Sequence, residues 1–221
     1  MDIRFDGRVA IVTGAGGGLG KSHALFLASR GAKVAVNDLG GAVDGSGSAS
    51  KAADQVVQAI KAAGGQAIAN YDSVADAKGA ERLVAETMQA FGQVDIVINN
   101  AGILRDKTFA KMELADFEQV MAVHLLGSVY VTKAAWPILQ QRMYGRVVMT
   151  TSAAGLYGNF GQTNYGAAKL ALVGFMNALK LEGQKHNILV NTIAPVAATR
   201  MTENLLPPQA LDRLKPDLVT P

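Results

Sequence analysis

The chain has 221 residues, of which 49% are hydrophobic and 18% are charged, and its formal net charge is +3. This composition supports a folded core and excludes a disordered or fibrous protein. The positive charge is too small for a nucleic-acid-binding surface, so we expect no nucleic-acid partner. Because the chain contains no cysteine, disulfide bonds, a thiolate nucleophile and a cysteine-ligated metal are excluded, and we expect no metal site.

The first twelve residues contain four charged side chains and therefore lack the apolar centre of a signal peptide. Later in the chain, no apolar run reaches the roughly 18 residues that a membrane-spanning helix needs. We therefore expect a soluble cytoplasmic protein that does not contact a membrane.

Six short runs of apolar and β-branched residues are predicted as strands, and longer segments with helical periodicity separate them. The predicted strands are 9–13, 33–37, 66–70, 94–99, 146–151 and 188–193. The predicted helices are 19–30, 50–63, 75–91, 114–141 and 165–186. This alternation predicts one α/β domain over residues 1–221, with a doubly wound parallel sheet covered by helices on both faces.

Two segments do not follow the alternation. Residues 39–50 are rich in glycine and serine and are interpreted first as a flexible surface loop, with a ligand-binding edge as the alternative. Residues 195–221 contain five of the six prolines and a short helical stretch at 209–214. We expect this second segment to be a mobile flap beside a substrate site.

A glycine-rich turn (TGAGGGLG, residues 13–20) follows the first predicted strand, and a helix begins directly after it. Such a turn lets the backbone approach a pyrophosphate at the N-terminus of the helix. Asp38 ends the second strand, where a carboxylate can bind the hydroxyls of an adenosine ribose. No basic residue stands in the glycine turn or beside Asp38, so the sequence favours NAD over NADP.

Two further polar positions lie at the ends of predicted strands. Asp72 follows the third strand and is interpreted either as a ligand of the adenine or as the N-cap of the next helix. Residues 99–102 (NNAG) close the fourth strand. A small polar turn at this edge of a parallel sheet can line a cofactor cleft, although alone it would be an ordinary turn.

Tyr165 and Lys169 are four residues apart at the start of a predicted helix, so both side chains project from one face. An ammonium beside a phenol lowers the pKa of the phenol from about 10 towards neutral pH, which suits a proton donor and acceptor. Ser152 follows the fifth strand, where its hydroxyl can hydrogen-bond the same substrate oxygen. The three residues together indicate acid/base chemistry at an oxygen atom.

In this order and at this spacing, residues 13–20, residues 99–102, Ser152, Tyr165 and Lys169 resemble the motifs of the short-chain dehydrogenase/reductase family. The stretches 36–41, 69–74, 99–106, 157–162 and 191–195 are most similar to the (3R)-hydroxyacyl-CoA dehydrogenase domain of peroxisomal multifunctional enzymes of type 2 and to bacterial single-domain relatives. The resemblance implies a Rossmann-type sheet with the strand order 3-2-1-4-5-6. It also implies reversible hydride transfer between NAD and the alcohol carbon of a 3-hydroxyacyl-CoA.

The resemblance further implies roles for individual residues. Tyr165 would be the catalytic acid/base, Lys169 would lower its pKa and hold the nicotinamide ribose, and Ser152 would polarise the substrate oxygen. The implied cofactor-binding residues are Gly14, Gly18, Leu19, Gly20, Asp38, Asp72, Val74, Asn99, Gly102, Tyr165, Lys169 and Thr199.

Three features depart from the family pattern. Many members place an asparagine of a water-mediated proton path where this chain has His124, which leaves its role open between a satisfied core residue and a part of the site. Val196 stands where a glycine usually follows the proline after the sixth strand. Members normally continue with another helix and a seventh strand, so we expect a domain that is truncated at its C-terminus and lacks that strand.

Two other functions remain open from the residues. One is the oxidation or reduction of another secondary alcohol, such as a steroid or a 3-oxoacyl carrier substrate. The other, from a different class, is a non-catalytic dinucleotide-binding module. The resemblance implies a small-molecule substrate, a homodimer or homotetramer packed through the long helices, and a peroxisomal location if the source is a eukaryote.

Overall fold

The structure is a computed structural model that describes residues 3–47, 50–199, 209 and 212–220. At its centre lies a six-stranded sheet in which all neighbouring strands are parallel. The strands are β1 (Val9–Thr13), β2 (Lys33–Asn37), β3 (Gln66–Asn70), β4 (Ile96–Asn99), β5 (Gly145–Thr150) and β6 (Ile188–Ile193). Their order, β3-β2-β1-β4-β5-β6, confirms the predicted Rossmann-type fold.

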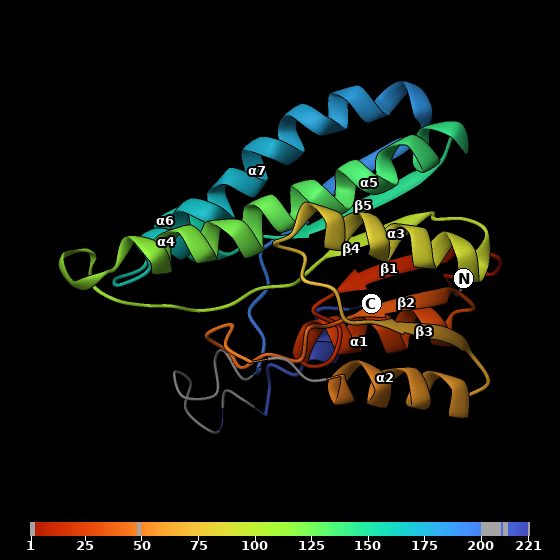
Figure 1. Ribbon diagram of the computed structural model, residues 1–221, viewed down its shortest axis with the longest axis horizontal. Helices are drawn as coiled ribbons and strands as arrows, with labels where there is room; N and C mark the ends of the chain where they lie inside the picture. The colour runs from red at the N-terminus through yellow and green to blue at the C-terminus, as the bar shows by residue number, and fades with distance from the viewer. Residues whose placement is uncertain (1–2, 48–49, 200–208, 210–211, 221) are drawn as a thin grey trace.

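Helices cover both faces of the sheet, as Figure 1 shows. The helices α1 (Gly18–Ser29) and α2 (Lys51–Ala62) lie on one face. On the other face lie α3 (Ala77–Phe91), α5 (Gly127–Gln141) and α7 (Thr163–Gly183), and α4 (Leu114–Met121) packs against α7. The shorter helical segments are η1 (Phe109–Lys111), η2 (Ala122–Leu126), α6 (Ala153–Tyr157), η3 (Gln184–His186) and η4 (Pro216–Leu218). Within the described ranges, no helix has the length and apolar character needed to cross a membrane.

Two buried apolar layers hold the helices to the sheet. The larger layer packs α3, α5 and α7 against the strands and includes Leu83, Leu139 and Leu172. The second packs α1 and α2 and includes Leu27 and Ile60. Burying one such side chain contributes roughly 1.5–3 kcal/mol, so the two layers fix the sheet and, with it, the turns at the carboxyl ends of the strands.

The helix predicted over residues 114–141 is interrupted. Its α-helical parts, α4 and α5, are joined by the π-helical turn η2, which contains His124. A π-turn inserts an extra residue into the helix and is frequent at functional sites. Here the turn lets the imidazole of His124 reach the backbone of Ile103, with its Nε2 3.1 Å from the nitrogen and 2.8 Å from the oxygen. The apolar pattern continues through the turn, so periodicity alone predicts one straight helix.

One helix start and one additional helix also differ from the prediction, each for an identifiable reason. The helix expected from residue 75 begins at Ala77, because the Asp76 carboxylate accepts hydrogen bonds from the backbone N–H groups of Lys78 and Gly79 and caps the helix. The short helix α6, which the sequence did not predict, follows Ser152, whose Oγ accepts a hydrogen bond from the Ala154 N–H at 3.1 Å.

The segment 195–221 is described at residues 195–199, 209 and 212–220. The Ala198 N–H donates to the Leu214 carbonyl oxygen at 2.6 Å. The Ser22 hydroxyl on α1 donates to the Asp217 carboxylate at 3.0 Å. The first contact joins the two larger described pieces of the segment to each other, and the second attaches the segment to α1. Residues 212–214, in the predicted helical stretch 209–214, form a turn and irregular backbone. The rest of the predicted flap, including residues 210 and 211 of that stretch, lies outside the described residues.

Candidate active site

A cavity of about 550 Å³ lies at the carboxyl ends of the strands, where ligands bind in open parallel sheets. Residues from the turns after all six strands line it. Every residue that the sequence proposes for the site lines this cavity, apart from Gly20 and Asn99. Residues separated by up to 185 positions in the chain, from Gly14 to Thr199, therefore meet around one space.

The glycine turn is packed backbone against backbone. Gly14 has a positive φ of 62°, and a Cβ there would lie 2.7 Å from the Ala101 Cα. A Cβ at Gly20 would collide with the carbonyl oxygen of Gly14, which explains why a glycine outside the cavity wall is still required. The turn thus presents bare backbone to the cavity at the N-terminus of α1, as a pyrophosphate cradle requires.

Asp38 lies against this cradle. One oxygen of its carboxylate accepts a hydrogen bond from the Gly16 N–H and the other from the Gly40 N–H, each at 2.7 Å. A Cβ at Gly16 would lie 2.8 Å from the same carboxylate, so a side chain there would displace it. Among the described residues that line the cavity, Lys169 is the only lysine or arginine.

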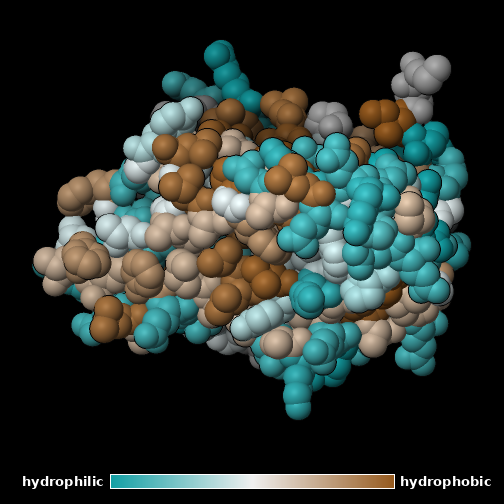
Figure 2. Space-filling view, turned by 90° about the horizontal axis from the view of Figure 1, so that it is seen from above, coloured by the Kyte–Doolittle hydropathy of each residue, from teal (hydrophilic) through white to brown (hydrophobic). Residues whose placement is uncertain are grey.

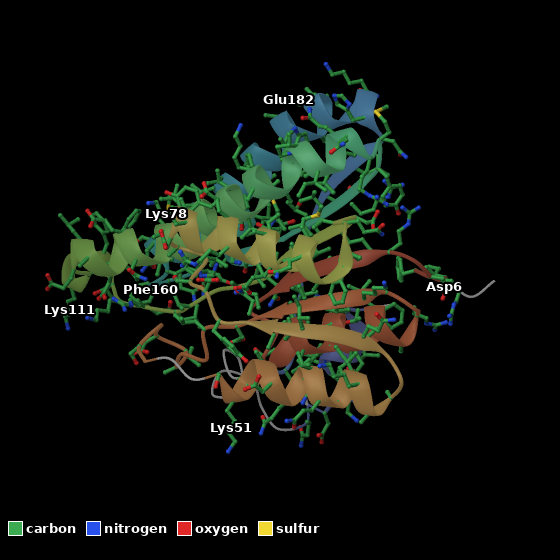
Figure 3. The ribbon with its side chains drawn as sticks, turned by 45° about the vertical axis from the view of Figure 1, so that its right-hand side comes forward. Asp6, Lys51, Lys78, Lys111, Phe160 and Glu182 are labelled. Carbon is green, nitrogen blue, oxygen red and sulfur yellow. The ribbon has the colours of Figure 1, made fainter. Side chains whose placement is uncertain are left out.

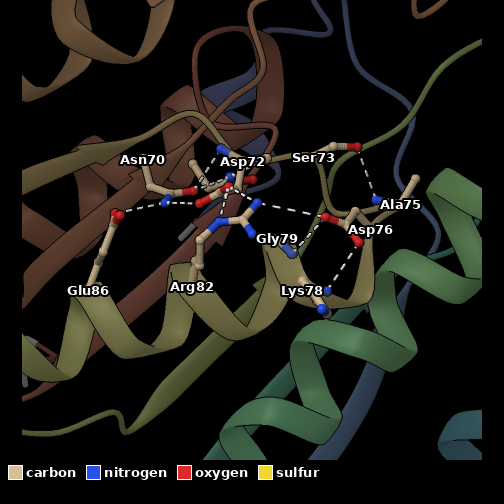
Figure 4. A network of polar contacts seen from close by, with 10 residues as sticks. Asn70, Asp72, Ser73, Ala75, Asp76, Lys78, Gly79, Arg82 and Glu86 are labelled. Atoms are coloured by element: carbon tan, nitrogen blue, oxygen red, sulfur yellow. Dashed lines mark hydrogen bonds and ion pairs between the residues drawn. The ribbon is translucent and has the colours of Figure 1, made fainter.

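Asp72 is held by a polar network at the start of α3, shown in Figure 4. Its Oδ1 accepts two hydrogen bonds from the Arg82 guanidinium, at 2.8 and 2.6 Å, and its Oδ2 accepts one from Asn70 at 2.8 Å. The interpretation of Asp72 as the helix N-cap is wrong, because Asp76 caps α3. Asp72 and the buried Val74 both line the cavity, which is compatible with the adenine-ligand alternative.

The turns after β1 and β4 are tied together at the point where the strand order reverses. The Thr13 Oγ1 accepts hydrogen bonds from the backbone N–H groups of Asn100 and Ala101, at 3.0 and 3.1 Å. The Asn100 side chain in turn donates to the carbonyl oxygens of Thr13 and Gly14, at 3.0 and 3.1 Å. Neither Thr13 nor Asn100 is among the residues predicted for the site, although both stand in the motifs at residues 13–20 and 99–102.

Asn99 lies just behind this wall. It is buried, and its Nδ2 donates to Thr132 at 2.9 Å. Its Oδ1 is buried without a hydrogen-bond partner among the described residues. Gly102 lines the cavity, and a Cβ there would collide with the imidazole of His124.

The glycine- and serine-rich segment after β2 forms one wall of the cavity. The Val43 carbonyl oxygen accepts a hydrogen bond from the Leu104 N–H at 2.9 Å, and the Asp44 carbonyl oxygen accepts one from the Arg105 side chain at 2.8 Å. The cavity-lining residues of this segment are Leu39, Gly41, Ala42, Val43 and Gly45. Residues 39–47 are thus a partly exposed loop that also forms a wall of the cavity, which favours the alternative of a ligand-binding edge.

Lys169 is buried, with 3% of its surface exposed. Its Nζ donates to the Thr150 carbonyl oxygen at 2.5 Å and lies 5.4 Å from the centroid of the Tyr165 ring. Burial disfavours the charged ammonium and lowers the pKa of Lys169 to about 7. The lysine is thus only partly charged at neutral pH.

The pKa of Tyr165 shifts in the direction opposite to the prediction. Burial raises it above 10, the hydrogen bond with Ser152 opposes the rise, and the negative charge of Asp106 adds to it. Lys169, whose own charge is disfavoured by burial, does not reverse the rise that burial causes in the pKa of Tyr165. The predicted lowering of the Tyr165 pKa is therefore wrong, because the loss of solvent around the buried phenol outweighs the effect expected from a neighbouring ammonium. Tyr165 therefore carries its proton at neutral pH.

His124 is 1% exposed and stands edge-on to Tyr165, with the ring centroids 5.2 Å apart and an interplanar angle of 89°. Burial, together with the nearby Lys169, lowers the pKa of His124 well below 6.5, so the ring is neutral. Its Nδ1 is buried without a partner in the part of the chain that the structure describes. His124 is thus a core residue whose Nε2 hydrogen-bonds the backbone of Ile103, and its ring also contacts the candidate acid/base Tyr165.

The segment after β6 reaches the glycine turn. A Cβ at Gly18 would lie 3.3 Å from the methyl group of Thr199, and Thr199 lines the cavity with Pro195 and Ala197. Val196, at the position where the family usually has glycine, is 56% exposed. Its side chain therefore does not fill the cavity.

The chain belongs to the short-chain dehydrogenase family, whose sequence profile matches residues 8–210. It is 57% identical over its full length to peroxisomal multifunctional enzyme A of Dictyostelium discoideum and spans 49% of that protein. It is 56% identical over 97% of its length to a short-chain type dehydrogenase/reductase of Mycobacterium tuberculosis and spans 75% of it. The resemblance to the multifunctional enzymes that the motifs indicate is thus confirmed.

Solved structures of short-chain dehydrogenases are similar to this fold as well. A short-chain dehydrogenase from Mycobacterium avium superimposes with a TM-score of 0.86 at 42% identity, covering 98% of this chain and 76% of that protein. A 7α-hydroxysteroid dehydrogenase in complex with NADH and 7-oxo-glycochenodeoxycholic acid superimposes with a TM-score of 0.84 at 30% identity, covering 95% of this chain and 79% of that one. Members of this family are oxidoreductases, which supports the prediction that this chain is an enzyme.

Proposed function

We propose that this chain is an NAD-dependent dehydrogenase that interconverts (3R)-hydroxyacyl-CoA and 3-oxoacyl-CoA. The observation that carries the proposal is the single cavity in which Ser152, Tyr165 and Lys169 face a bare glycine cradle with Asp38 at its edge. In this proposal the acid/base set and the cofactor site belong to one domain, with the segment 195–221 beside the substrate.

The residues fit a nicotinamide dinucleotide. The cradle leaves no room for a side chain at Gly14, Gly16 or Gly20, so its backbone stays close to the cavity and N–H groups there can receive a pyrophosphate. Asp38, Asp72 and Val74 line the half of the wall formed after β2 and β3, which suits an adenosine. Gly102, Tyr165, Lys169 and Thr199 would hold the nicotinamide half, and Asn99 would support the wall behind it.

The Asp38 carboxylate supports NAD over NADP. It lies at the glycine turn with both oxygens already accepting backbone hydrogen bonds, so its negative charge stays at the place where a 2′-phosphate would lie. The mouse relative is named peroxisomal multifunctional enzyme type 2, and the yeast relative peroxisomal hydratase-dehydrogenase-epimerase. These names support a dehydrogenase and, if the source is a eukaryote, a peroxisomal location. The acyl-CoA substrate and a role in fatty acid metabolism are what the resemblance of the motifs implies.

Each catalytic side chain has a task that follows from its surroundings. A bound nicotinamide dinucleotide supplies the hydride donor or acceptor. Ser152 donates a hydrogen bond to the oxygen on the reacting carbon, and the protonated Tyr165 gives its proton to that oxygen as a ketone is reduced. For oxidation, Tyr165 must first lose its proton, so the raised pKa makes this direction faster at alkaline pH. Lys169, with its pKa of about 7, exchanges a proton readily at neutral pH.

The comparisons support both of the alternative substrates that the residues left open. The NADH-bound structure with a bile acid favours a steroid alcohol. A 3-oxoacyl-[acyl-carrier-protein] reductase of Synechocystis is 42% identical over 90% of this chain, which favours a carrier-bound substrate. The complete acid/base set of Ser152, Tyr165 and Lys169 argues against a non-catalytic module, because dinucleotide binding alone does not require it.

The proposal includes a homodimer or homotetramer packed through α5 and α7. Figure 2, which views the molecule from above, shows hydrophobic side chains gathered on part of that face. Leu170 and Leu181 on α7 and Leu126 in η2 are 50%, 68% and 40% exposed. Exposed apolar area on a helix surface is typical of subunit contacts.

The deciding experiment follows NADH absorbance while the purified chain receives NAD or NADP with each enantiomer of 3-hydroxybutyryl-CoA, a longer homologue, a 3-hydroxyacyl carrier protein or a steroid alcohol. The proposal expects turnover of the (3R)-acyl-CoA with NAD. Faster turnover of a steroid or of the carrier-bound substrate would favour the alternatives. NAD binding without turnover of any of these alcohols would favour the non-catalytic module.

A further inference from the structure

The amide of Gln162 lines the cavity at the start of α7, three residues before Tyr165. It is 8% exposed, although glutamine is usually a surface residue. It stands at the N-cap position of the helix but makes no side-chain capping bond there. A buried amide that does not cap its helix requires other partners.

Those partners fix which way the amide faces. Its Nε2 donates to the Asp106 Oδ2 at 2.6 Å, and its Oε1 accepts a hydrogen bond from the Asn159 Nδ2 at 2.9 Å. Because an ionised carboxylate only accepts hydrogen bonds, Asp106 orients the NH₂ group towards itself. One N–H of that group is used, and the second has no partner among the described residues.

The negative charge of Asp106 lies directly behind the amide, because its Oδ2 is 2.6 Å from the Gln162 Nε2, and the same charge contributes to the raised pKa of Tyr165. The adjacent cations do not neutralise it. Arg105 and Lys107 are both ion-paired with Asp116, at 3.0 and 3.2 Å. The cavity therefore offers, beside the acid/base, an oriented amide donor backed by a negative charge.

This arrangement distinguishes substrates by what lies two carbons from the reacting alcohol. A 3-hydroxyacyl thioester has an uncharged carbonyl oxygen there, which accepts a hydrogen bond. A free 3-hydroxy acid has a carboxylate there, which the charge of Asp106 repels. A simple secondary alcohol has no oxygen at that place and leaves the buried amide without a partner.

We propose that Gln162 donates its remaining N–H to the C1 carbonyl oxygen of the substrate and so selects 3-oxygenated acyl thioesters, while Asp106 is a positioning residue that aims the amide and disfavours free acids. The inference rests on the proposed function and adds to it the residues that read the second oxygen. The rim beside them is apolar: Tyr157 and Phe160 are 87% and 88% exposed, and Figure 3 places Phe160 near the α4 end of the molecule.

The test compares kcat/KM for two substrates that differ in one oxygen: 3-hydroxybutyryl-CoA and the thioether S-(3-hydroxybutyl)-CoA, which has no C1 carbonyl. Gln162→Leu should lower kcat/KM about 10- to 100-fold for the thioester, the range expected for one lost hydrogen bond in a buried site, and less than threefold for the thioether. Gln162→Glu, which loses the N–H but keeps the size, should give the same pattern. Gln141→Leu, on an exposed position of α5, is the matched control.

A second comparison tests Asp106 through the preference for thioester over free 3-hydroxybutyrate. Asp106→Asn keeps an acceptor for Gln162 and removes the charge, so the preference should fall about tenfold while NADH affinity and melting temperature stay unchanged. Asp106→Ala should lower kcat/KM for the thioester as well, because the amide is no longer aimed.

The outcomes separate this inference from the proposed function. A wild-type chain that oxidises steroids and no 3-hydroxyacyl compound refutes both. Turnover of the thioester with equal losses on thioester and thioether in Gln162→Leu refutes only the assignment of Gln162. An unchanged preference for the thioester over the free acid in Asp106→Asn refutes only the role of its charge.

Discussion

The imidazole of His124 meets the ring of Tyr165 edge to face, and it occupies the space that a side chain at position 102 would need. The acid/base is therefore supported from behind by a neutral buried ring, and that ring depends on a glycine in the turn after β4. Close packing of this kind makes the two positions energetically coupled.

Gly102→Ala should destabilise the fold by roughly 1–3 kcal/mol and lower kcat, because the new methyl group displaces His124. In a His124→Ala background the space is vacant, so the same change should cost less than about 0.5 kcal/mol. Urea unfolding of the two single variants and the double variant measures the coupling. Strictly additive losses would show that the two residues do not compete for the same space.

Lys169 should make stability depend on pH in the alkaline range. Its folded pKa of about 7 lies below its unfolded value, so its contribution is complete above the unfolded pKa and is lost as the pH falls towards 7. Between pH 7 and 10 the unfolding free energy should rise by up to roughly 1.4 kcal/mol per pH unit from this group. Lys169→Met should flatten the slope, whereas Lys180→Met, an exposed lysine on the same helix, should leave it unchanged.

Tyr165→Phe should lower kcat by roughly 10²- to 10⁴-fold, the usual contribution of a general acid/base, with NAD affinity nearly unchanged. Oxidation by the wild-type chain should accelerate from neutral to alkaline pH, because the pKa of Tyr165 is raised. Tyr144→Phe keeps the ring that packs against the Arg8 guanidinium and serves as the control. An active Tyr165→Phe variant would remove the tyrosine from the mechanism.

Asp38→Ala and Asp38→Arg should reduce the ratio of kcat/KM for NAD to that for NADP by about tenfold or more, the arginine variant most strongly. The reason is that the carboxylate occupies the edge of the glycine cradle where a 2′-phosphate would lie. Asp54→Asn, which changes a carboxylate on α2 outside the cavity, is the control. If the ratio stays constant, the selector lies elsewhere.

The sheet was predictable because each strand is a short run rich in apolar or β-branched residues and is followed by a turn. The predicted bounds of β1, β2, β3 and β6 agree with the structure, and the glycine turn and the Tyr165–Lys169 pair lie where their spacing places them. Such features depend on residues close together in the chain.

The features that were missed depend on residues far apart in the chain. The π-turn at His124 forms around the backbone of Ile103, and the amide of Gln162 is oriented by Asp106, 56 positions away. The pKa of Tyr165 depends on how deeply the folded chain buries it, which spacing does not express. Asp72 is paired with Arg82, so a residue that resembles a cap serves the wall of the cavity.

The mutual hydrogen bonds of Thr13 and Asn100 hold the turns of β1 and β4 at a fixed separation through protein contacts alone. The crevice between the two halves of the sheet is therefore built during folding. Dinucleotide binding at this point would then require little reordering of the backbone, and most of its favourable contacts would appear as affinity. The two halves of the sheet would also come apart together. Cofactor binding and the folded sheet would therefore be lost at the same temperature.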